Sequence, residues 1–280
     1  MRKALAVGLL VLVTCPMLRA ENYDLRSKYK VGQVITVRSL WDSSMKVTEA
    51  DNKDVMDTLK GEFRSVRKAE VRYTIAKVRK GTTAVANAEV IAADDTEQMP
   101  GVDEKTTSSP ATGKTVVVTT DAEGKSTYGY ENGGEVDKAA QDLCNDLDED
   151  LFRGIDVSNA AVGQEWTVPE DVARKVFDIS AKGEASVTLK FAEVLDQDDR
   201  HLARLTMAAR LQDEPEDEEG MTMRSMQLTG DYLWDLDRHI TYKVTAEGTV
   251  KITGTDKDMG NMTLEGPIAI KSEFEDVTGK

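Results

Sequence analysis

Histidine and cysteine do much of the chemistry of proteins at neutral pH, and this chain has few of either. His201 and His239 are the only histidines, and each lies in or beside a predicted hairpin turn. The chain has no H-x-x-x-H pattern and no C-x-x-C pair, so a zinc site or a Cys–His dyad is disfavoured. His239 could act as a base only with a serine that folding brings beside it.

The sequence patterns of common enzyme nucleophiles and nucleotide sites are also missing. There is no G-x-S-x-G elbow, no P-loop and no G-x-G-x-x-G fingerprint. We therefore expect no catalytic residue, no cofactor-binding residue and no enzyme activity.

Two acidic runs could supply oxygen ligands to a metal, Asp196–Asp199 and Asp213–Glu219. Neither has the D-x-D-x-D-G spacing that wraps a calcium ion. A solvated loop whose charges discourage edge-to-edge association of strands is the favoured interpretation. The sequence therefore predicts no metal site.

Large aromatic and sulfur-containing side chains could line a ligand site. The tryptophans are Trp41, Trp166 and Trp234, and a group of methionines lies in the second half of the chain at Met207, Met221, Met223 and Met226. Methionine suits an adaptable apolar cavity, and tryptophan can stack on a ligand. Such residues at strand positions more often belong to the hydrophobic core, so the favoured interpretation is that they fill the core and do not contact a ligand.

The N-terminus has the pattern of a secretory signal peptide. Arg2-Lys3 is followed by an apolar run from Ala4 to Val13, and Leu18-Arg19-Ala20 offers a cleavage site before Glu21. We expect residues 1–20 to be removed and the protein to be exported, to the periplasm or the extracellular space. The alternative is a lipid anchor on Cys15, although Thr14 departs from the residue that normally precedes a lipidated cysteine.

The charge of the mature chain limits its partners. Removing residues 1–20 takes away three basic residues, so 36 − 3 = 33 lysines and arginines face 51 acidic residues and the net charge changes from −15 to −18. Phosphates would be repelled, which excludes nucleic acid as a partner and disfavours anionic lipid surfaces. No other apolar stretch approaches membrane-spanning length, and Cys144 alone cannot form an internal disulfide. The partner expected instead is an unidentified envelope component or a hydrophobic ligand.

Three segments recur in the same order about 120 residues apart, which predicts a duplicated module. Val31–Val37 returns as Val162–Val168 with five of seven positions identical. Weaker echoes link 69–78 with 185–194, and 121–128 with 235–242. The predicted organisation is a signal peptide (1–20), a first β-rich module (21–134), a linking helix (135–158) and a second β-rich module (159–280).

Both copies read as antiparallel hairpins. Val71, Tyr73 and Ile75 alternate with polar residues, and the alternation then slips by one residue at Ala76. The second copy slips at the matching Ala192, which predicts a β-bulge in the same place. With the other predicted hairpins, the chain should form about ten to twelve strands.

One convincing helix is predicted between the copies. Val136, Leu143 and Leu147 follow helical spacing over the 18 residues 135–152, and the acidic residues fall on the other side. A weaker helix starts at Pro169, and residues 96–114 read as a loop. The fold class is therefore mainly β with minor α, a curved antiparallel sheet or half-barrel built from two tandem repeats.

The motifs resemble a group of uncharacterised exported bacterial proteins, of a type found in planctomycetes. The resemblance rests on the V-G-Q opening, the segment 187–194 and Gly230–Arg238, and it covers most of the mature chain. It carries no functional residues with it. The strand count and helix also resemble the half-barrels of periplasmic lipoprotein carriers, at the level of fold alone. The function expected is non-enzymatic binding of an apolar or peptidic ligand on the concave face of the sheet. The alternative is a structural or interaction protein of the cell envelope.

Overall fold

The structure is a computed structural model of the 280-residue chain. It describes residues 21–52, 56, 59–80, 82–121, 125–144, 151–152, 155–214, 221–256 and 260–278, and for 221, 222 and 256 it describes the backbone alone. The predicted signal peptide, including Cys15, lies outside the described residues.

Nearly all of the described chain belongs to one large antiparallel sheet or to the segments that pack on it. The strands are β2 (Val34–Ala50), β3 (Phe63–Arg79), β4 (Thr82–Gln98), β5 (Lys105–Ser108), β6 (Thr115–Thr120), β7 (Ser126–Tyr130), β9 (Glu165–Thr167), β10 (Glu184–Gln197), β11 (Arg200–Asp213), β12 (Met221–Asp235), β13 (Ile240–Asp256) and β14 (Gly260–Asp276). Their order is β7-β6-β4-β3-β2-β14-β13-β12-β11-β10-β9, with β5 beside β4. A separate two-stranded sheet pairs β1 (Asn22–Tyr23) with β8 (Ala160–Ala161).

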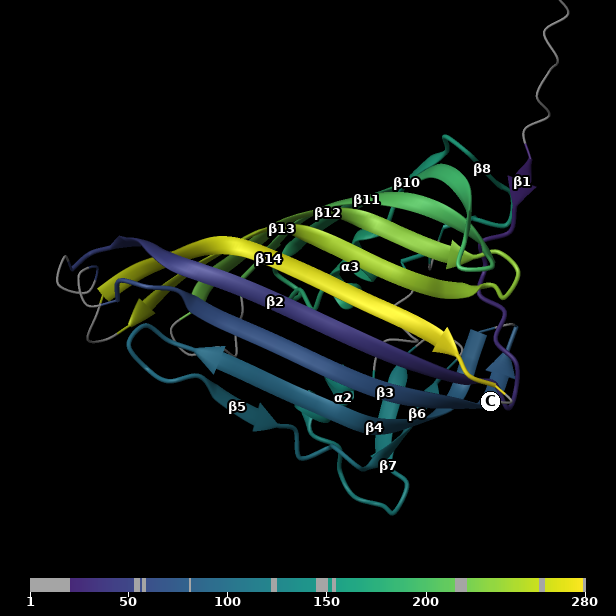
Figure 1. Ribbon diagram of the computed structural model, residues 1–280, viewed down its shortest axis with the longest axis horizontal. Coiled ribbons are helices and arrows are strands. Elements are labelled where there is room, and N and C mark those ends of the chain that lie inside the picture. The colour runs from purple at the N-terminus through teal and green to yellow at the C-terminus, as the bar shows by residue number, and fades with distance from the viewer. Residues whose placement is uncertain are drawn as a thin grey trace, which may run out of the picture.

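The predicted mainly β fold is confirmed, and the first and last long strands join the two halves of the sheet. Val34–Ala50 of the first half pairs with Gly260–Asp276 of the second half along most of their length. The sheet is curved, and the helices lie on its inner side, behind the strands in the view of Figure 1. Residues 96–114 are not wholly a loop as predicted, because β4 continues to Gln98 and β5 pairs with it.

The two repeated hairpins carry a register shift where the sequence predicts one. Ile75 pairs with Ala86 and Lys77 with Val85, so Ala76 is the extra residue of a bulge in β3. In β10 the shift lies between Phe191 and Glu193, which makes Ala192 the extra residue. A bulge bends its strand and increases the local twist, so both halves of the sheet bend at matching places.

The repeated V-G-Q segment makes the same hydrogen bonds in both copies. Gly32 N–H donates to Ile75 O at 2.8 Å, and Gly163 N–H donates to Phe191 O at 2.7 Å. Each glycine has a positive φ, and each glutamine side chain accepts from the backbone N–H three residues earlier. The segment therefore forms a turn that docks on the residue just before each bulge.

The helix between the copies is shorter than predicted. α2 spans Lys138–Leu143, with Asp137 as its N-cap and Cys144 as its C-cap. Residues 145–150, including Leu147, lie outside the described residues. The second predicted helix is confirmed as α3 (Glu170–Val176), with Pro169 as its N-cap. No described helix is long and apolar enough to cross a membrane.

Candidate functional site

The two faces of the sheet differ in chemistry. The outer face carries cross-strand ion pairs that are partly exposed, including Arg38–Glu70, Arg64–Asp42, Arg72–Glu89, Arg204–Asp231 and Lys243–Glu273. Such exposed pairs contribute little to stability, but they mark a face that is in contact with water. The inner face is mainly apolar, although it also carries the partly exposed ion pair Arg67–Asp95, so an apolar ligand site is best placed there.

Two separate cores lie on the inner face. The first core contains Val71, Tyr73 and Ile75 of β3. It is covered by Ala140 of α2 and by Val136, which precedes that helix. The second core is larger, and α3 together with residues 151–160 covers it over β10 to β13. Leu25 is fully buried in this second core, although it belongs to the first predicted module (21–134) in the sequence.

Between the two cores, apolar side chains on the inner face remain half-buried. Trp41 of β2 pairs directly with Ile270 of β14, and Met45 and Ile252 lie on the same face. All four pack against the edge of the second core, and we call them the central strip. Short side chains lie beside Trp41 on its own strand, at Ser39 and Ser43, whereas Arg67 of β3 pairs with it directly and Leu264 of β14 pairs with Ile252. Along its own strand, Trp41 is therefore flanked by side chains too short to cover it.

A diagonal of three glycines bends the sheet beside the central strip. Gly230, Gly248 and Gly266 lie on the neighbouring strands β12, β13 and β14. A Cβ at each would lie within 2 Å of a backbone oxygen of the adjacent strand, at Thr245, Gln227 and Ser44 respectively. Only glycine allows the backbones of adjacent strands to approach this closely. Glycines of this kind mark sharp bends in sheets.

The two histidines lie in or beside turns, as the sequence predicts, with His201 near the start of β11 and His239 in the turn after β12, and neither is free. His201 Nδ1 lies 2.8 Å from a carboxylate oxygen of Asp196. His239 has a positive φ and binds the N-terminal segment through both ring nitrogens.

Residues 22–28 form a segment that we call the N-terminal strap. Its first two residues pair with β8, and the Tyr23 ring packs edge-on against Phe191 at 5.6 Å. Leu25 N–H donates to Val157 O at 3.0 Å. The strap then reaches the turn between β12 and β13, where Lys28 N–H donates to His239 O.

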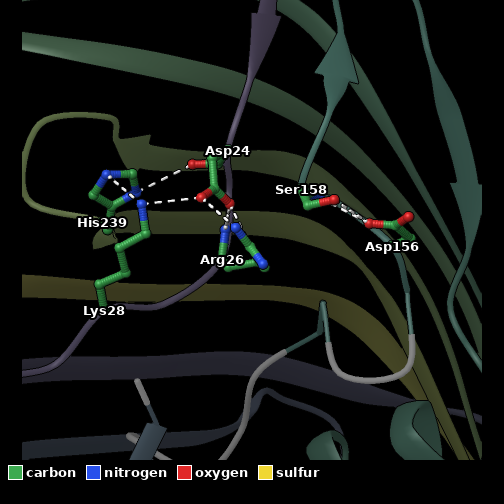
Figure 2. Close-up of polar contacts among 6 residues, drawn as sticks. All are labelled: Asp24, Arg26, Lys28, Asp156, Ser158 and His239. Carbon is green, nitrogen blue, oxygen red and sulfur yellow. Dashed lines mark hydrogen bonds and ion pairs between the residues drawn. The ribbon is translucent and has the colours of Figure 1, made fainter. Parts of the chain in front are cut away.

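Asp24 organises the charged part of the strap (Figure 2). It accepts two hydrogen bonds from the Arg26 guanidinium, both at 2.8 Å, and pairs with Lys28 Nζ at 3.0 Å. The Arg26 hydrogen bonds, aided by Lys28, hold the pKa of Asp24 well below its usual range. Nearby, Ser158 donates to Asp156 and lowers its pKa. The Asp24 carboxylate thus stays charged and bound at any moderate pH.

The acidic runs take different places in the structure. In the first run, Asp198 accepts from Tyr242 Oη at 3.0 Å and Asp196 contacts His201. Of the second run, residues 215–219 lie outside the described residues. Across the described part of the chain, no group of three or more His, Cys, Asp or Glu side chains is arranged to hold a metal ion.

The prediction of a solvated loop is wrong for Asp213, which is buried at the end of a strand. It is the last residue of β11, only 2% exposed, and pairs with Arg224 at 3.0 Å. Burial raises the pKa of Asp213, but hydrogen bonds from Ser180 and the charge of Arg224 outweigh it, so the pKa is lowered. Its inward position could have been found from the alternation of β11, because Leu211 and Asp213 fall on the same face.

The tryptophans and methionines are mostly core, as the sequence favoured. Trp234 and Trp166 are 1% and 9% exposed, and Met207 and Met226 are buried beside them in the second core. Met223 is exposed, and the Met221 side chain lies outside the described residues. Trp41 differs because it is half-buried in the central strip. Cys144 is a buried thiol in the first core and forms no disulfide.

Two solved structures are similar to the chain at low sequence identity. No protein-family model matches the chain, and no curated protein is similar to it. A structure described as "lipid-protein interactions in lipovitellin" is similar with a TM-score of 0.45 and 11% identity over 90% of this chain. This chain spans about a quarter (26%) of the length of that protein. DynF from the dynemicin biosynthesis pathway of Micromonospora chersina is similar with a TM-score of 0.27 and 7% identity, over 92% of this chain and 86% of DynF.

Proposed function

We propose that this protein is an exported, non-enzymatic binding protein that holds an apolar ligand on the inner face of its sheet. The observation that carries the proposal is the central strip. Trp41 and Ile270 pair directly, lie between two closed cores and stay half-buried on the apolar face. An apolar patch that the protein's own chain leaves partly uncovered is typical of a binding site.

The chemistry of the strip favours an acyl chain or a similar flexible hydrocarbon. Its residues are an indole, a thioether and two isoleucines, which offer contact area and adaptable packing but few hydrogen bonds. The signal-peptide pattern of residues 1–20 supports export. The alternative function, a structural or interaction protein of the cell envelope without a small ligand, predicts that the strip binds no hydrocarbon.

Tryptophan fluorescence can test the proposal, because the three tryptophans differ in burial. A fatty acid with bromine atoms on its acyl chain quenches an indole only on contact. Trp41 should be quenched because it lies in the strip, whereas Trp166 and Trp234 are shielded in the second core. Trp41→Phe should abolish the quenching, and Trp166→Phe should preserve it.

A matched pair of charge substitutions separates the two faces of the sheet. Ile270→Glu places a carboxylate within the strip and should weaken fatty-acid binding about tenfold or more. Leu40→Glu adds the same charge next to Trp41 in sequence but on the outer face, where Leu40 pairs with Lys68 and Lys271. This control should bind normally. Equal binding by both variants, or quenching that survives Trp41→Phe, would refute the proposal.

A further inference from the structure

The ring contacts of His239 define its protonation state. Nδ1 lies 3.1 Å from the backbone oxygen of Asp24, and a carbonyl oxygen can only accept a hydrogen bond. Nε2 lies 3.1 Å from Lys28 Nζ, and an ammonium group can only donate. The ring therefore carries its proton on Nδ1 and accepts at Nε2, so only the neutral imidazole satisfies both contacts.

We propose that His239 is an acid-sensitive latch that holds the N-terminal strap on the second core when neutral and releases it when protonated. A proton on Nε2 would remove the acceptor of Lys28 and place two positive charges about 3 Å apart. Histidine is the side chain whose charge ordinarily changes between about pH 5 and pH 8. Strap binding is thus complete at the higher pH and weakens as the pH falls.

The charged groups around the ring do not neutralise the added charge. On the strap, the Asp24 carboxylate is already bound to Arg26 and to Lys28. On the turn itself, the Asp235 carboxylate is 1% exposed and is bound to Arg200 and Arg238.

Two further carboxylates lie near this turn. Asp237 follows Asp235 in the turn and is exposed to water, so solvent screens it. Asp276, at the end of β14, accepts from Thr278 and Gln33 and interacts with Arg238. No described contact places any of these carboxylates on the His239 ring.

Release of the strap would change the second core directly. Leu25 is fully buried in that core and Tyr23 packs on Phe191, so a detached strap would leave apolar contacts open to water. The latch goes beyond ligand binding by the central strip and does not depend on it, because the strap contacts involve none of the four strip residues.

Hydrogen exchange measured by mass spectrometry on the full chain tests the latch. The peptide that contains residues 22–28 reports on the Leu25 and Lys28 amides, which donate to Val157 O and His239 O. Its protection factor should fall by between about tenfold and about 100-fold from about pH 7.5 to about pH 5.5, because one linked proton changes an equilibrium at most tenfold per pH unit. Paired amides of β12 and β13 serve as the internal reference and should keep their protection.

Three variants decide between the latch and a general effect of acid. His239→Asn keeps a side chain that tolerates positive φ but cannot titrate, so strap protection should no longer depend on pH. Lys28→Gln should also hold the strap at both pH values, because its amide can donate to the neutral ring and accept from the protonated one. His201→Asn should behave as wild type, since the His201 ring contacts Asp196 and not the strap.

Two results would overturn the latch. One is a wild-type strap equally protected at both pH values. The other is a fall in protection that persists unchanged in Lys28→Gln, and this variant decides the matter even if His239→Asn does not fold.

Discussion

The glycine diagonal makes a sharp prediction about Gly248. An added methyl group there would lie 1.8 Å from the backbone oxygen of Gln227, whereas ordinary van der Waals contact begins at 3.4 Å. The strands β12 and β13 would have to separate by about 1.6 Å (3.4 minus 1.8), which would break nearby inter-strand hydrogen bonds. We expect Gly248→Ala to lower the free energy of unfolding by about 3 kcal/mol, at the upper end of the usual cost of overpacking.

Urea denaturation followed by circular dichroism measures this effect as a lower midpoint at an unchanged slope. Gly129→Ala is the matched control, because Gly129 lies in the edge strand β7 and an added Cβ would meet nothing within 4 Å. Its unfolding free energy should change by less than about 0.5 kcal/mol. If Gly248→Ala is as stable as Gly129→Ala, the backbones of β12 and β13 do not approach as closely as described. The bend of the sheet beside the central strip would then also be wrong.

Further predictions concern the strap, the buried ion pair, the acidic turn and the N-terminus. Leu25→Ala should lower the unfolding free energy by about 3 kcal/mol in the same urea assay, because a fully buried leucine leaves a cavity. Arg224→Met should cost about 3 kcal/mol, because Asp213 would remain buried without its cation. The lowered pKa of Asp213 means that its stabilisation is complete above the unfolded-state pKa and is lost as the pH falls through the lowered folded value, so urea midpoints measured in acid should show less difference between wild type and Arg224→Met. Calcium at millimolar concentration should raise the melting temperature no more than magnesium does, and a calcium-specific rise that is lost when Asp196, Asp198 and Asp199 become Asn would contradict the prediction of no metal site. Sequencing of the exported protein should begin at Glu21 without a lipid, and a lipidated Cys15 would contradict the signal-peptide assignment.

The elements that could be predicted from the sequence are those fixed by local periodicity. The slip in alternation at Ala76 and Ala192 marks the two bulges, because each strand must keep its apolar residues on one face through the irregularity. The length of the helix between the copies is overestimated because it, too, is predicted from apolar spacing. Leu151 continues its apolar spacing, but residues 151 and 152 belong to a turn that packs in the second core. Apolar spacing shows which residues are buried, not whether the backbone between them is helical.

The strap and the central strip depend on contacts between distant residues. His239 and Asp24 are 215 residues apart, and nothing in either segment marks the other as its partner. Trp41 and Ile270 meet only because β2 pairs with β14. That pairing joins the two halves of the chain, so a reading of each half alone could not reveal which apolar residues remain half-buried between the cores.

The most direct test of the proposed function is native mass spectrometry of the protein purified from its own host. Three forms should be compared: wild type, Ile270→Glu and Leu40→Glu. The apolar-ligand account predicts a bound amphiphile on wild type and Leu40→Glu that is absent from Ile270→Glu. A wild-type protein that carries no ligand, or a ligand retained equally by Ile270→Glu, would contradict it and favour an envelope protein without a small ligand.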